Sequence, residues 1–164
     1  MKQLSLDAFS LKMIAIISMM VHHTAVVMWE VIPFSVHIPL YFLRGVTFPI
    51  MAFFLVEGFR RTSNIKKYML RLLVFALIAQ VPYMLALNYF VPNIIFTILV
   101  GLICLTLYDK FYVTKTKQEL FIFLFIVIIL LTSFFEGGIL GPILIFMYHK
   151  IKDEKKRRTL PLIC

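Results

Sequence analysis

The sequence predicts an all-α fold, a polytopic transmembrane helix bundle of about six spans, from three observations. Hydrophobic residues make up 62% of the 164 residues, charged residues make up 15%, and the mean hydropathy is +0.95. Soluble domains have roughly 45–50% apolar and about 25% charged residues, so this chain has too few polar residues to cover a water-soluble surface. Its apolar stretches are continuous rather than alternating, which favours helices over a β-barrel. We therefore expect one integral membrane domain, residues 1–164, with the lipid bilayer as its solvent.

Each predicted span is an apolar run bounded by polar, proline or glycine residues. The spans are expected near residues 13–31, 38–59, 69–90, 93–108, 120–135 and 139–148. The sixth is short for a bilayer. Its pairing with the fifth through a tight turn at Gly137 and Gly138 supports it, because an even number of spans agrees with the charge pattern.

The net charge of +9 is concentrated in alternate connections and in the tail. Positive charge confined to alternate loops is typical of membrane topology rather than of nucleic-acid binding, so we expect no nucleic-acid partner. The pattern predicts that the N-terminus, the two basic loops and the C-terminus are cytoplasmic. The basic residues are Arg60, Arg61, Lys66, Lys67 and Arg71 after the second span, Lys110, Lys115 and Lys117 after the fourth, and Lys150, Lys152, Lys155, Lys156, Arg157 and Arg158 in the tail.

Two adjacent histidines, His22 and His23, lie in the uncharged stretch from residue 13 to residue 29. Histidine is costly inside a membrane span, so it indicates a functional site with a partner elsewhere. At about 100° per residue, Lys12, His23 and Glu30 share one stripe of a helix with Met19, whereas His22 points roughly a quarter-turn away. His23 is therefore expected to be the buried group that takes a proton from an attacking amine or hydroxyl. The alternative is a histidine that hydrogen-bonds a neighbouring helix and only stabilises the bundle.

The second predicted span contains two charged residues, Arg44 and Glu57. They are thirteen residues apart, or about 20 Å of helix, so they do not pair with each other. For Arg44 three roles remain open: snorkelling outward, orienting a carbonyl, or pairing with a group such as Glu30. Glu57 is either a site residue or one half of an interfacial ion pair with the basic loop that follows it.

That basic loop has two interpretations. Its cations could hold the phosphates of a cytoplasmic cofactor, or they could set the topology and attract anionic lipid headgroups. The sequence contains no P-loop, GxGxxG or CxxC pattern and no metal-ligand motif such as HExxH, so we predict no metal site.

Several spaced motifs resemble the TraX family of membrane proteins, over roughly Leu11 to Gly141. They are Leu11-Lys12-Met13-Ile14-Ala15, Met20, His22-His23, Arg44, Phe48-Pro49, Glu57-Gly58, Thr62, Asn64, Lys67-Tyr68, Arg71-Leu72, Gln80, Pro82-Tyr83, and Asn93-Ile94-Ile95-Phe96-Thr97 with Gly101. Where this chain has His22, the family pattern usually has aspartate.

The resemblance implies a multi-pass protein of the bacterial cytoplasmic membrane, in a family named for acetylation of the pilin N-terminus in conjugative systems. The family is similar to larger membrane acyltransferases that place a span-one histidine in catalysis. On that basis His23 is the expected general base, with Arg44 and Glu57 in the catalytic set. Acetyl-CoA is the implied donor, and a protein N-terminus or another amine or hydroxyl is the acceptor. The residues expected to bind the donor are Arg60, Arg61, Lys67, Tyr68 and Arg71.

Two other functions compete with an acetyltransferase. One is a small carrier or channel, in which the stripe of Lys12, His23 and Glu30 lines a polar path. The other is a non-catalytic membrane protein. The apolar residues 159–164 after the basic tail resemble the start of a further span, which suggests a C-terminally truncated family member; a natural short tail is the alternative.

Overall fold

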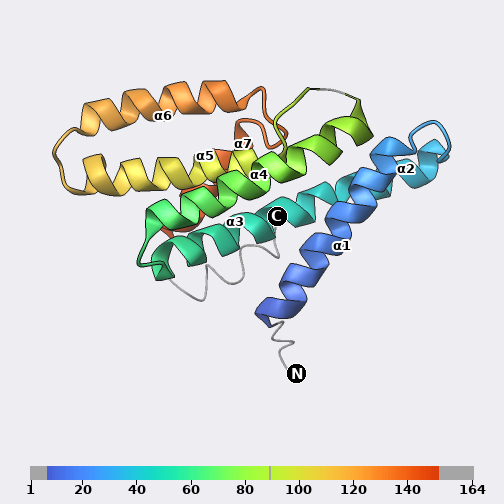
Figure 1. Cartoon of the computed structure of the whole chain (residues 1–164), viewed down its shortest axis with the longest axis horizontal. Helices are drawn as coiled ribbons and strands as arrows, with labels where there is room; N and C mark the ends of the chain where they lie inside the picture. The colour runs from blue at the N-terminus through green and yellow to red at the C-terminus, as the bar shows by residue number, and fades with distance from the viewer. Residues whose placement is uncertain (1–6, 89, 152–164) are drawn as a thin grey trace.

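The computed structural model describes residues 7–88 and 90–151, and within these ranges it is helical with no β-strand. The predicted all-α fold is thus confirmed (Figure 1). The elements are α1 (Ala8–Val27), α2 (Phe34–Phe42), α3 (Arg44–Arg61), α4 (Ile65–Leu87), α5 (Ile94–Leu107), the π-helical segment η1 (Tyr108–Val113), α6 (Gln118–Thr132) and α7 (Leu140–Lys150).

Four helical stretches of the described chain are long and apolar enough to cross a membrane: Ala8–Val27, Phe34–Arg61, Ile65–Leu87 and Ile94–Val113. Helices α6 and α7 are apolar but shorter, with 15 and 11 residues. A helix lies in each of the six predicted ranges, but whether all six cross the bilayer stays a prediction. The cytoplasmic placement of the termini also stays a prediction.

The second predicted span, residues 38–59, lies within the candidate span Phe34–Arg61, but this span is not one unbroken helix. It is divided into α2 and α3 at Leu43, whose backbone N–H donates to the Leu40 carbonyl at 3.3 Å instead of continuing the regular pattern. Pro39 inside α2 removes a hydrogen-bond donor, and Gly45 in the first turn of α3 has low helix propensity, so the helix is weakest around this position.

Three helices begin at a side chain that accepts a hydrogen bond from their first turn. Asp7 accepts from Ser10 N at 2.8 Å, and Asn64 accepts from Lys67 N at 2.9 Å. Asn93 accepts from Ile95 N at 3.0 Å. These caps satisfy N–H groups that a helix leaves without an internal partner. The caps Asn64 and Asn93 fix the residues at which α4 and α5 start.

The core lies between α3, α5 and α7. Its fully buried side chains include Val56, Leu102, Leu105, Ile145 and Tyr148. Gly101 allows α5 and α7 to pack closely, because a Cβ at this position would overlap Ile145 Cδ1. Helices α4 and α6 instead carry many exposed apolar side chains on their outer faces, which suits contact with lipid.

The helices run back and forth between two ends of the bundle (Figure 1). We call the end where α3 passes to α4 and α5 passes to α6 the basic end; it holds Arg60, Arg61, Lys67 and Arg71. We call the end where α1 passes to α2, α4 to α5 and α6 to α7 the histidine end. It holds His22, His23 and His37.

Candidate functional site

A small, partly open cavity of about 20 Å³ lies at the histidine end, between α1, α3, α5 and the turn from α6 to α7. At this size it has room for about one water molecule. Its lining residues are Met19, His22, His23, Thr47, Phe48, Ile94 and Glu136.

The imidazole of His23 is oriented from both sides. Its Nδ1 lies 2.8 Å from the Met19 carbonyl oxygen, one turn earlier in α1, and its Nε2 lies 3.4 Å from Glu136 Oε1. A carbonyl oxygen only accepts, so Nδ1 carries a hydrogen and donates. Nε2 therefore faces Glu136. One proton shared by Nε2 and Oε1 gives an ion pair when it is on the imidazole and a neutral hydrogen-bonded pair when it is on the carboxyl group.

Glu136 comes from the turn between α6 and α7 and is tied to the start of α5. Its backbone N–H donates to the Pro92 carbonyl at 3.0 Å, and its Oε2 accepts from Ile94 N at 2.8 Å. The N-terminus of a helix favours negative charge. The side chain of Glu136, which is 10% exposed, is thereby directed at His23.

The start of α5 is in turn fixed to α4 by a buried amide network. Asn93 is 3% exposed, and its Nδ2 donates to the Ala76 carbonyl at 2.9 Å. Gln80 accepts from Asn93 N and donates to the Val91 carbonyl, both at 2.9 Å. These bonds set the position of Ile94 N, and through it the position of the Glu136 carboxylate.

The His23 side chain, predicted to be the buried group, is 27% exposed, and the more deeply buried histidine is His22. It is 5% exposed, lines the same cavity as His23, and packs edge-on against the rings of His23 and Tyr41 at centroid distances of 5.4 and 5.2 Å. The prediction failed because α2 folds back over this face of α1. Buried His37 of α2 stabilises that return, with Nε2 3.1 Å from the Ala25 carbonyl oxygen.

The predicted polar stripe along the first span is also wrong at its outer end. Helix α1 ends at Val27, so Glu30 lies in the following turn, where it is exposed and off the helical stripe. At the other end the Lys12 Nζ lies 5.0 Å from the centre of the Phe54 ring on α3. Met19 and His23 still lie on one face of α1, and the acidic residue near His23 is Glu136 rather than Glu30.

The two charged residues of the second predicted span stay apart. Arg44 is the first residue of α3, and its backbone alone is described. Glu57 pairs with Arg61 at 3.2 Å, which is the ion pair with the basic loop that the sequence left open. Glu57 comes ten residues after Thr47, or about 15 Å along the helix, so the structure does not bring it to the histidine cavity.

The residues predicted to bind the donor lie at the basic end. Arg60 NH2 donates to the His149 carbonyl at 2.7 Å, and Tyr68 packs half-buried against Gly58. Lys67 and Arg71 are exposed. Arg60 comes thirteen residues after Thr47, or about 20 Å along α3, so these residues and His23 lie at opposite ends of the bundle.

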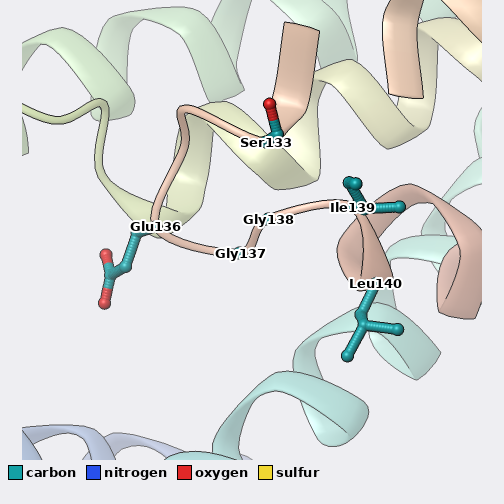
Figure 2. Close-up of a pocket in the computed structure, with 6 residues that line it drawn as sticks. All are labelled: Ser133, Glu136, Gly137, Gly138, Ile139 and Leu140. Carbon is teal, nitrogen blue, oxygen red and sulfur yellow. The ribbon is translucent and has the colours of Figure 1, made fainter. Parts of the chain in front are cut away.

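Glu136 also borders a second hollow, an open groove of about 310 Å³ along the α6–α7 turn (Figure 2). The other lining residues are Ser133, Gly137, Gly138, Ile139 and Leu140. Sequence reasoning missed Glu136 as a site residue. One signal was available in the sequence. Glu136 is the charged residue in the connection between the fifth and sixth predicted spans, and this connection is predicted on the same side of the membrane as the end of the span that contains His23.

Fold and site together define a class: an all-helical membrane protein with a histidine–glutamate pair between its helices. The chain belongs to the TraX family, whose model, described as TraX protein, matches residues 7–164. It is also 30% identical to the probable fimbrial assembly protein FimC, serogroup H1, of Dichelobacter nodosus, over 97% of this chain and 68% of that protein. No solved structure matches the chain.

Proposed function

We propose that this protein is a membrane acetyltransferase that moves an acetyl group from acetyl-CoA to an amine, such as a protein N-terminus, or to a hydroxyl. The observation that carries the proposal is the His23–Glu136 pair, oriented on both sides and bordering a small cavity. The family membership and the fimbrial assembly relative support an acceptor that belongs to a surface appendage.

The pair is suited to general acid–base chemistry. An amine reaches the site as an ammonium ion and must lose a proton before its nitrogen attacks a carbonyl carbon. Together His23 and Glu136 can take a proton from the acceptor nitrogen and return one to the leaving sulfur, as the nitrogen–carbon bond forms and the carbon–sulfur bond breaks. The ammonium's other lost proton goes to water, so the products are an amide and a thiol.

Acetyl-CoA, when bound, supplies an activated acetyl thioester. The exposed cations Lys67 and Arg71 suit its phosphates by charge, whereas Arg60 and Arg61 already engage His149 and Glu57. The proposal therefore requires the pantetheine arm to cover the roughly 20 Å between the basic end and the histidine end along the outside of the bundle, because the core between α3, α5 and α7 is filled.

The direct test is transfer of labelled acetyl from acetyl-CoA to a panel of peptides with free N-termini, using protein in detergent or liposomes. His23→Ala should lower the rate by at least about 100-fold, as loss of a general base does. Glu136→Gln should lower it similarly, because the amide cannot hold the proton. Thr24→Ala is the matched control, since Thr24 is the exposed neighbour on α1 and its hydroxyl bonds Met20 of the same helix.

Equal rates for wild type and His23→Ala would refute catalysis by this pair. Proton flux into liposomes that is lost in His23→Ala, with no transfer to any acceptor, would instead favour the carrier.

A further inference from the structure

We propose that the acceptor reaches His23 through the groove at the α6–α7 turn, as a primary ammonium recognised by Glu136. The inference rests on the proposed function and adds the route, the end of the bundle from which the acceptor comes, and the charge of its reacting group.

The first observation is that two hollows share one lining residue, Glu136. The small cavity of about 20 Å³ contains His23 and Glu136, and the open groove of about 310 Å³ also contains Glu136. The small cavity has no room for a substrate, whereas the groove is at the lower end of the size of ligand sites. Figure 2 shows the Glu136 carboxylate at one edge of the groove, pointing away from Ile139 and Leu140.

The second observation is what lies in the opposite direction. Between the cavity and the basic end, the bundle is filled by the packed side chains of α3, α5 and α7, among them Val56, Leu102 and Leu105, each with no exposed surface. An acceptor coming from the basic end would have to displace this core. The groove requires no such displacement.

The third observation is the backbone conformation and packing of the turn between α6 and α7. Gly138 has φ +55°, a conformation that favours glycine, and Gly137 approaches α5 so closely that a Cβ would lie 2.5 Å from Thr97 Cγ2. The Gly137 N–H also donates to Thr97 Oγ1 at 3.3 Å. The turn is thereby held against α5, and the two glycines that follow Glu136 add no side chain to the groove.

The fourth observation is charge. Glu136 is the charged residue among those that line the groove, so a cationic group is the complementary ligand. An ammonium that replaces His23 as the partner of Glu136 would leave its nitrogen next to the imidazole that takes its proton. A neutral hydroxyl acceptor would lack this attraction.

The test uses thiol chemistry in full-length protein with Cys104→Ala and Cys164→Ala, reconstituted in liposomes. Ser133→Cys places a thiol in the groove, and Ser63→Cys places an exposed thiol at the basic end as the matched control. Labelling by a bulky, membrane-impermeant maleimide is followed with a short peptide that has a free N-terminus, or with the same peptide N-acetylated. Acetyl transfer is measured for each variant before and after labelling.

We expect the free peptide, and not the acetylated one, to slow labelling of the Ser133→Cys thiol. Adding Glu136→Gln should weaken the peptide's apparent affinity about tenfold, as loss of a charge-assisted hydrogen bond does. Complete labelling should abolish transfer in Ser133→Cys, and the free peptide should not slow labelling of the Ser63→Cys thiol. In membranes of defined orientation, the two thiols should react from opposite sides.

Three results would overturn the route: equal labelling with both peptides, full transfer by completely labelled Ser133→Cys, or labelling of both thiols from one side. Failure of the proposed function looks different. In that case the unlabelled protein shows no transfer, although the free peptide still protects the groove thiol.

Discussion

The imidazole of His23 is anchored at Nδ1 by a backbone oxygen, Met19 O, rather than by an acidic side chain. That contact fixes which nitrogen faces the cavity, because a main-chain carbonyl one turn away cannot change rotamer. In the family pattern an aspartate usually precedes the histidine; here that position holds His22, and the acid near His23 is Glu136 instead. Glu136 belongs to a different element from His23, the turn between α6 and α7.

Asp7 offers a residue-scale test of pH dependence at the start of α1. Hydrogen bonds from Ser10, first from its hydroxyl and then from its backbone N–H, hold the pKa of the exposed Asp7 carboxyl below its ordinary value of 3.8. A lowered folded-state pKa means that the cap contributes fully above pH 3.8 and is lost as the pH falls through the folded value.

We therefore expect amide exchange at Ser10 to rise relative to mid-helix amides as the pH is lowered below 3.8, measured by NMR in micelles. Asp7→Asn keeps a capping oxygen but does not titrate, so its relative exchange should stay flat. Equal pH profiles for the two proteins would contradict the assignment.

At the level of elements, helix positions follow from the sequence more closely than helix packing does. Apolar runs between polar caps such as Asn64 and Asn93 predicted α4 and α5 to within a few residues, because lipid requires continuous apolar helices. The break at Leu43 was missed because proline and glycine near a span end are tolerated in many contexts. The burial of His22 was missed because it depends on α2 folding back over α1, a tertiary contact that periodicity does not contain.

The contact of α5 with α7 gives an element-scale prediction. Gly101→Ala should destabilise the protein by about 1–3 kcal/mol, because the new methyl overlaps Ile145 Cδ1 inside a full core. Combination with Ile145→Val, which removes that methyl, should recover part of the loss. Thermal unfolding in detergent is the measurement.

Gly45→Ala is the matched control, since a Cβ at Gly45 meets nothing within 4 Å. It should be neutral or slightly stabilising because alanine is the better helix former. Additive effects of Gly101→Ala and Ile145→Val would show that these two residues do not compete for the same space.

At the scale of the whole molecule, the site joins segments that are distant in the sequence. The sequence identified His23 from the cost of histidine in a membrane, but no local pattern links residue 23 to residue 136. The basic loop was also identified from the sequence. Its separation from the histidines was not, because it depends on α3 running as one helix from the histidine end to the basic end.

The topology predicted from charge can be tested on the same scale. Six passes would return the chain to the side on which it started, so a fluorescent reporter at the C-terminus should fold and emit in the cytoplasm. A periplasm-specific phosphatase fused after Ser133 should be active, whereas the same enzyme fused after Ser63 should be inactive. Phosphatase activity in the Ser63 fusion would invert the proposed orientation.

The bond between Glu136 and Ile94 N has a consequence for how the protein is made. The ribosome produces both histidines early, and more than a hundred residues follow before their acidic partner is synthesised. Throughout that interval His23 resides in a nascent membrane domain without its counter-ion. The pair of His23 and Glu136 can form once the hairpin of α6 and α7 has inserted beside α5, so assembly of the proposed site waits for this hairpin.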